Sequence, residues 1–172
     1  MYVFSAYVVP LTTPAFSHPF QFLTKPRLTQ HNHFRSTWTT LHTATQTNKR
    51  PPNMSIRAFI ALGLSFVQSL TMHHNIEEAH VFPMLAAKMP RFREQEVMKA
   101  QHRAIHDGLD RFERYLEGCQ GGEWELRLGE LGEIMDGFGD VLWQHLDQEI
   151  KELEAANMRR FWTVEEMRRM NF

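Results

Sequence analysis

Three segments of the chain each carry a pair of metal-binding side chains spaced four residues apart. The pairs are His73 with Glu77, His102 with His106, and His145 with Glu149. Residues four apart lie on the same face of an α-helix, with their Cβ atoms roughly 5–6 Å apart, so both members of a pair can reach one ion. Imidazole and carboxylate groups together suit iron, manganese and zinc, so this spacing predicts metal binding.

Each pair also continues a stripe of apolar residues at helical spacing, which predicts that the pair points into a hydrophobic core. The stripe that leads to His73 contains Phe59, Phe66 and Leu70. The other two stripes contain Ile105, Leu109, Phe112 and Leu116, and Phe138 and Leu142. A buried ionisable group without a partner destabilises the fold by several kcal/mol, so these groups must bond to one another or share metal ions.

The apolar pattern predicts four long helices, over residues 28–45, 56–85, 92–116 and 124–156. Ser55 is the expected N-cap of the second helix, and Pro83 should end or kink its last turn. Long amphipathic helices joined by short connectors favour an all-α fold, an antiparallel up-and-down four-helix bundle.

The ends of the chain differ from this core. Gly118 to Gly122 should stop the third helix. Thr163 and Glu166 have the spacing of a capping box, which predicts a short fifth helix near the C-terminus. Residues 1–28 contain four prolines and no helical period, so we expect a poorly ordered N-terminal leader. The length then leaves one bundle domain over residues 29–172.

Composition narrows the partners and the compartment. A net charge of −1 gives no argument for binding nucleic acid or a membrane, and no apolar run approaches the roughly 20 residues of a membrane span. The single cysteine, Cys119, fits a reducing compartment, so we expect the protein in the cytoplasm. No acidic residue precedes Glu77, which leaves a mitochondrial transit peptide as the minor alternative.

The number of ligands indicates how many ions are bound. One histidine from the first helix, His31 for preference, brings the set to five imidazoles and two carboxylates, more than one tetrahedral zinc accepts. If two ions share both carboxylates and an oxygen bridge, and the imidazoles divide three to two, one ion keeps an open position. Iron or manganese suits such ligands better than zinc, and oxygen, nitric oxide or peroxide could bind an iron there.

These segments resemble the hemerythrin-like (HHE cation-binding) proteins, and among them the small fungal members, over about residues 30 to 166. The resemblance implies two non-heme iron ions with an oxygen bridge inside a four-helix bundle, tied to oxygen, nitric oxide or iron handling. The matching residues are His31-Asn32-His33-Phe34-Arg35, His73-His74-Asn75-Ile76-Glu77-Glu78 with Val81-Phe82-Pro83, Gln101-His102 with His106, and Leu142-Trp143-Gln144-His145 with Glu149.

Three ligand assignments stay open in the sequence. In the first helix His31 competes with His33; the family pattern of a large apolar residue three positions later favours His31, because Phe34 follows it. In the second helix the pair His73 and Glu77 competes with His74 and Glu78, and the apolar stripe favours the former. Glu149 competes with Asp147, whose spacing from His145 is poor for a shared ion. Surface or loop positions are expected for His18, His42 and His80.

Three functions fit these features. The first, which we favour, is a non-catalytic binder that senses, stores or transports a small diatomic ligand or iron itself. The second is a low-turnover enzyme that acts on peroxide or nitric oxide or repairs iron centres. The third is a structural bundle in which metal only stabilises the fold. The excess of histidine over carboxylate favours reversible binding over oxygen activation, and no general acid or redox-active cysteine stands out.

Overall fold

The computed structural model describes residues 19–93 and 95–170, and within that part every regular element is helical. The predicted leader lies outside the described residues as far as residue 18. From Pro19 onward the chain is helical, so the first helix begins earlier than the predicted boundary at Leu28.

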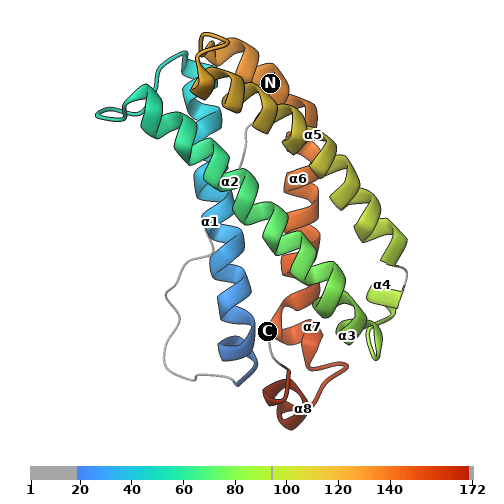
Figure 1. Ribbon diagram of the computed structural model, residues 1–172. Coiled ribbons are helices and arrows are strands. Elements are labelled where there is room, and N and C mark those ends of the chain that lie inside the picture. Colours follow the sequence, from blue (N-terminus) through green and yellow to red (C-terminus); the bar gives the residue numbers. More distant parts are fainter. Residues whose placement is uncertain (1–18, 94, 171–172) are drawn as a thin grey trace.

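Four long helices and several short ones make up the fold (Figure 1). The long ones are α1 (Pro19–Thr47), α2 (Ile56–Ile76), α5 (Gln95–Gly121) and α6 (Leu128–Leu153). The short ones are the π-helix η1 (Glu77–Val81), α3 (Phe82–Ala86), α4 (Pro90–Arg93), α7 (Ala155–Met158) and α8 (Val164–Arg168).

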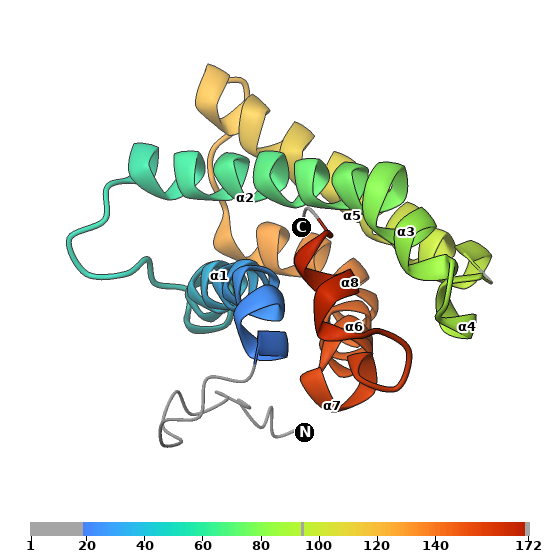
Figure 2. The same ribbon diagram turned by 90° about the horizontal axis from the view of Figure 1, so that it is seen from below.

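The long helices pack as a closed ring. Helix α1 contacts α2, α2 contacts α5, α5 contacts α6, and α6 returns to α1. The view from below shows α1 and α6 on one side of the bundle and α2 and α5 on the other (Figure 2). Consecutive long helices run in opposite directions (Figure 1), and the predicted all-α bundle is confirmed. Helices α7 and α8 pack on α1.

The local signals at two helix starts are confirmed. Ser55 caps α2 by accepting a hydrogen bond from the backbone N–H of Ala58. Thr163 and Glu166 form a complete capping box, each side chain accepting from the other residue's backbone N–H, and this fixes the start of α8.

The bundle is layered along its length. The larger hydrophobic cluster fills one end, with residues such as Phe59, Phe112 and Phe138. A smaller cluster, with Phe82, Phe92 and other side chains, closes the opposite end. Each of α2, α5 and α6 crosses from the larger cluster to the end of the smaller one, and polar residues occupy the layer between. The polar side chains of this layer therefore lie between the two hydrophobic clusters.

Pro83 does not end its helix. Instead the chain forms the π-helix η1 directly before it, in which the backbone N–H of Phe82 donates to the carbonyl of Glu77 five residues earlier. Proline has no N–H and its ring clashes with the carbonyl four residues before it. The wider π-helical turn shifts the backbone hydrogen bonds from the fourth to the fifth preceding carbonyl at this point. Helix α2 therefore continues through η1 into α3 without a break.

The segment Gly118 to Gly122 ends α5 as predicted, but the helix boundaries on both sides of the connection differ from the prediction. Helix α5 continues through Gly118 and ends at Gly121, followed by Gly122 with a φ of +79°. A Cβ at Gly118 would lie 2.4 Å from the ring of Trp124, so this glycine makes room for the returning chain. Helix α6 then starts at Leu128, because the backbone N–H of Arg127 donates to the Tyr115 hydroxyl instead.

Glycine in α6 allows close contact with α1. A Cβ at Gly139 would meet the Trp38 ring at 2.9 Å, and one at Gly132 would meet the Thr45 side chain at 3.1 Å. Glycine lowers intrinsic helix stability by about 1 kcal/mol against alanine. At these two positions close packing of the helices explains why it is present.

By length and composition alone, the continuous helix from Ile56 to Ala86 is apolar enough to cross a membrane, with a mean hydropathy of 1.2. The core helix of a soluble protein passes the same test, so this is weak evidence. Here the helix turns His73, His74 and Glu77 toward the other helices, and such groups are costly in a lipid bilayer. We therefore treat it as a helix of the bundle core.

Candidate metal centre

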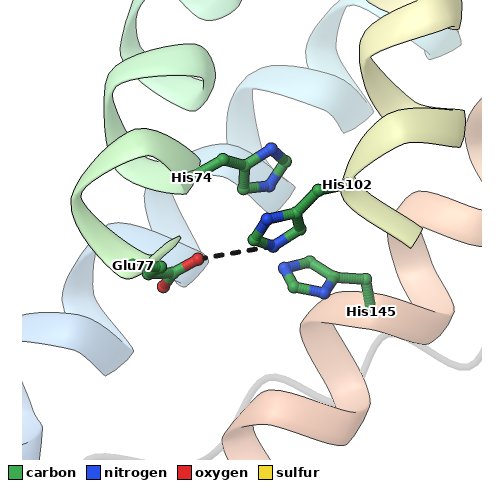
Figure 3. Close-up of side chains that lie close together, drawn as sticks. All are labelled: His74, Glu77, His102 and His145. Atoms are coloured by element: carbon green, nitrogen blue, oxygen red, sulfur yellow. Dashed lines mark ion pairs between the residues drawn. The ribbon is translucent and has the colours of Figure 1, made fainter. Parts of the chain in front are cut away.

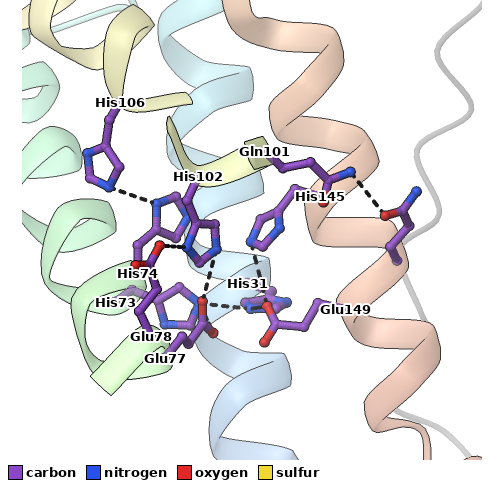
Figure 4. A network of polar contacts seen from close by, with 11 residues as sticks. His31, His73, His74, Glu77, Glu78, Gln101, His102, His106, His145 and Glu149 are labelled. Carbon is purple, nitrogen blue, oxygen red and sulfur yellow. Dashed lines mark hydrogen bonds and ion pairs between the residues drawn. The ribbon is translucent and has the colours of Figure 1, made fainter. Parts of the chain in front are cut away.

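Seven buried side chains with metal-binding atoms meet between the two hydrophobic clusters. They come from all four long helices and from the π-turn, and none is more than 5% exposed. They are His31 on α1, His73 and His74 on α2, Glu77 on η1, His102 on α5, and His145 and Glu149 on α6. Figure 4 shows them pointing toward one another across the axis of the bundle.

Four of these residues form the first group, His74, Glu77, His102 and His145 (Figure 3). One nitrogen or oxygen from each lies within 4.8 Å of the others. The rings of His74 and His102 stack with centroids 4.0 Å apart, and the His145 ring stands edge-on to both. This group can hold one ion with three imidazoles and one carboxylate.

The second group contains His31, His73, Glu77 and Glu149, again with one atom each within 4.8 Å. The Nε2 atoms of His31 and His73 lie 3.0 Å apart. His31 Nε2 lies 3.1 Å from Glu149 Oε2, and His73 Nε2 lies 2.8 Å from Glu77 Oε1. This group can hold a second ion with two imidazoles and two carboxylates.

Glu77 belongs to both groups, and helix geometry explains why. At 100° per residue, His73 and His74 lie about 40° and about 60° on either side of Glu77. All three therefore fit in the ~100° arc that an amphipathic helix buries. Glu77 can offer one carboxylate oxygen toward each group, so the two candidate ions would share it.

The outer nitrogens of two imidazoles have polar partners. Glu78 accepts a hydrogen bond from His102 Nδ1 at 2.8 Å, and His74 Nδ1 lies within hydrogen-bond distance of His106 Nε2, at 3.3 Å. Such contacts fix the orientation of a ligating ring and leave its other nitrogen facing the metal. In both residues the inner atom is Nε2.

Burial keeps the imidazoles of His74, His102 and His145 neutral. It lowers the pKa of His145 to about 4, although Glu149 acts in the opposite direction. Burial is also the main cause that lowers the pKa of His102, and it holds the pKa of His74 well below the ordinary value, with help from the neighbouring imidazoles. A neutral imidazole has the lone pair that a metal ion needs, so these three rings can bind a metal ion at neutral pH without first losing a proton.

Glu149 is the anionic member of the second group. Burial would raise its pKa, but the electrostatic interaction and the hydrogen bond with His31, together with a smaller interaction with His145, outweigh this and hold the pKa well below the ordinary value. The site thus combines neutral nitrogen donors with a carboxylate, the donor set that iron, manganese or zinc accepts.

The geometry fits a metal ion better than an empty core. The Nε2 atoms of His74, His102 and His145 are buried without a hydrogen-bond partner, which is costly unless an ion binds them. In the second group the contact distances cluster near 3 Å, the separation expected of neighbouring donors that each lie about 2.1 Å from one ion. The burial of the donors in the first group and the donor spacing in the second both fit a bound metal ion.

Six of the seven predicted ligands are brought together by the structure. In the first helix His31 is buried and belongs to the second group, while His33 is exposed and belongs to neither group. The six are His31, His73, Glu77, His102, His145 and Glu149.

The seventh predicted ligand, His106, lies outside both groups, and His74 lies in the first group instead. His106 is half-buried and contacts His74 from the side of α5 that faces α2. The buried face of an amphipathic helix is wide enough to include two residues per turn. The apolar stripe that contains Leu70 therefore allows His74 to be buried as well as His73, and this signal could have predicted His74 from the sequence. The total remains five imidazoles and two carboxylates.

The remaining polar candidates lie away from the centre. Glu78 makes the outer hydrogen bond expected of that helix face. Asp147 is exposed, pairs with Arg35 at 2.6 Å and belongs to neither group, whereas Glu149 belongs to the second. His42 pairs with Asp136 at the surface, His80 is exposed, and His18 lies outside the described residues.

A four-helix bundle with two histidine and glutamate groups that share one carboxylate defines a class of metal-binding protein. Known sequences place the chain within it. The model of the hemerythrin HHE cation-binding domain family matches residues 28–156, so the chain belongs to this family.

One curated relative gives a further comparison. A dimeric xanthone biosynthesis cluster protein, R11, from Cryptosporiopsis sp. (strain 8999) is 28% identical over 125 residues. The match covers 67% of this chain and 47% of the relative, so the chain spans about half the length of that protein. No solved structure matches the chain.

Two alanine variants can test whether His74, and not His106, binds the ion of the first group. We expect His74→Ala to lose the ion of the first group, so that the metal content falls by about half, because three donors remain there. We expect His106→Ala to weaken binding by roughly tenfold, as the loss of an outer hydrogen bond does, and to keep full occupancy in excess metal. Metal analysis after dialysis against graded metal concentrations measures both. The assignment is wrong if His106→Ala loses the ion and His74→Ala keeps it.

The metal-free protein should lose stability in mild acid. Below pH 6.5 the unfolded chain binds a proton at His145, whereas the folded chain does so only near pH 4. Stability is therefore complete above pH 6.5 and falls as the pH drops through this window, by about 3 kcal/mol from this residue alone. Urea unfolding at several pH values measures the slope. A His145→Asn variant should have a shallower slope, and an unchanged slope would contradict the assignment.

Proposed function

We propose that the protein holds two non-heme iron ions, joined by Glu77 and an oxygen bridge, and that it binds a small diatomic ligand reversibly. When bound, the pair of ions supplies a redox-active position for oxygen or nitric oxide. The chain itself orients the imidazoles, keeps those of His74, His102 and His145 neutral and excludes water with its two hydrophobic clusters.

The observation that carries this proposal is the enclosure of the donors. All seven candidate ligands are at most 5% exposed and lie between Phe66 and Leu70 on one side and Phe82 on the other. An organic substrate cannot approach such a site without opening the bundle. A diatomic molecule is small enough to reach it through ordinary side-chain motion.

The donor types support reversible binding over oxygen activation. Five imidazoles and two carboxylates form the two groups, three imidazoles in one and two in the other. The carboxylate-rich di-iron bundles use mostly glutamate. Fewer anionic ligands leave the ions less electron-rich, which favours holding a ligand over splitting it.

The test is optical spectroscopy of iron-loaded protein. We expect a new absorption band when the reduced protein meets oxygen or nitric oxide, and we expect the band to disappear when the gas is removed. The matched control is the same protein loaded with zinc, which occupies the same donors but has no redox chemistry and should show no band. An iron-loaded protein whose spectrum ignores both gases would contradict the proposal.

One observation favours an enzyme as the second candidate. The relative from Cryptosporiopsis is named for a biosynthesis cluster, although this chain spans only about half of its length. A low-turnover enzyme acting on peroxide or nitric oxide would consume its ligand instead of releasing it. Repeated additions of peroxide to the iron-loaded protein separate the candidates, because only an enzyme removes many equivalents per chain.

A further inference from the structure

A groove of about 550 Å³ runs along the outside of the bundle between α2 and α5. Its wall includes Met72 and Ile76 from α2, both exposed, and His106 from α5. His106 Nε2 also lies 3.3 Å from Nδ1 of His74 in the first group. Figure 4 draws this contact between the two rings. The His106 side chain thus borders both the outer groove and a buried candidate ligand.

The polar side chains of the groove suit a metal cation. Asp110 and Glu113 on α5 supply two carboxylates, and His80 and His106 supply two imidazoles. Among the described residues that line it there is no lysine or arginine. Carboxylates on a confined surface raise the local concentration of cations, and imidazoles can bind such an ion transiently.

A second hollow on the bundle lacks these properties. It lies between α5 and α6 and includes Glu96, Gln101 and the positively charged Arg103. Gln101 is tied to Gln148 by a hydrogen bond of 3.0 Å, and neither glutamine belongs to a metal group. This hollow provides no chain of metal-binding side chains to the centre.

We propose that the groove between α2 and α5 is the entry route for divalent metal ions, and that His106 passes them from Asp110 and Glu113 to His74. The inference rests on the proposed function only in requiring that the two groups bind metal. It gives His106 a role outside the final ligand set: a side chain at the inner end of the route that binds the ion on its way in.

The test measures how fast metal-free protein takes up cobalt(II) or iron(II) without oxygen, by stopped-flow absorption. In a double variant, Asp110→Asn with Glu113→Gln, we expect uptake at low salt to be about fivefold slower, because electrostatic attraction speeds association by tenfold or more at such sites. The difference should shrink in high salt, and the final metal content should not change. The matched control is the double variant Glu96→Gln with Asp107→Asn. It removes the same number of negative charges from the same helix but outside the groove, so it should keep the wild-type rate.

A His106→Ala variant tests the transfer step. If His106 only blocks the route, removing its ring speeds uptake; if it passes the ion on, uptake slows even though the path is wider. We expect uptake to be roughly tenfold slower. Faster uptake, or equal slowing in the groove and control variants, would overturn the proposal. A protein that binds no metal at all would instead contradict the proposed function, so the two failures are distinguishable.

Discussion

Replacing Glu77 by glutamine is expected to remove both metal ions from the protein. Glu77 is fully buried and is the residue common to both candidate groups. An amide has nearly the same shape but no negative charge, so each ion loses its shared anionic ligand. Loss of an outer hydrogen bond weakens metal binding by about 10–100-fold, and loss of a direct, shared ligand should exceed that for both ions. Metal analysis after dialysis measures the effect.

The neighbouring glutamate supplies the control. Glu78 follows directly in the chain, accepts a hydrogen bond from the outer nitrogen of His102, and has a side chain that is 38% exposed. We expect Glu78→Gln to bind metal more weakly by about tenfold but to retain two ions per chain at saturation. If Glu77→Gln keeps one ion at full occupancy, Glu77 is a ligand of a single ion and the shared carboxylate is wrong.

Removing the metal should lower the melting temperature by about 15–30 °C. A ligand that binds only the folded state stabilises it by about 4 kcal/mol when its free concentration is a thousand times its dissociation constant, so two ions contribute roughly 8 kcal/mol. For a domain of this size each kcal/mol corresponds to roughly 2–4 °C. Without metal, the Nε2 atoms of His74, His102 and His145 stay buried and unsatisfied.

Thermal unfolding followed by circular dichroism, with and without a chelator, measures this shift. The Glu77→Gln variant is the control, since it should already lack metal and its melting temperature should not respond to the chelator. A wild-type protein that melts at the same temperature with and without metal would mean that the ions contribute little to the fold. The structural role of the centre would then be minor.

The sequence was sufficient to predict the fold because periodicity is a local property. The stripe of Phe59, Phe66 and Leu70 and the capping signals at Ser55 and Thr163 fix helices one at a time. The boundaries needed tertiary information. Helix α5 passes through Gly118 because Trp124 folds back on it, which is a contact that the chain makes only after it turns.

The centre was predictable up to the choice between side chains one turn or one residue apart. The spacing of His73 and Glu77 predicted a ligand pair, which lies on α2 and η1, but His74 is equally well buried. Which ring reaches the axis depends on how α2 and α5 are rotated about their own axes, and helix packing sets that rotation. His106 lies on the edge of the buried face of α5, so the contact with α2 draws it away from the axis and toward His74.

The layered core suggests why the centre tolerates so many polar groups. Helices α5 and α6, and α2 with its continuation through η1 and α3, each pass from one hydrophobic cluster through the polar layer to the other. Metal binding would satisfy the layer, and the two clusters would hold the helices in register on either side. Stability and ligand geometry are thus coupled, as expected where metal binding and folding are linked.

The central claim is that one chain holds two iron ions that share Glu77. The most direct test is the iron-to-protein ratio of the purified protein, combined with Mössbauer spectroscopy of the oxidised form at low temperature. We predict two iron ions per chain and a magnetically coupled pair with no net spin. One iron per chain, or two irons that behave as independent paramagnetic ions, would contradict the claim.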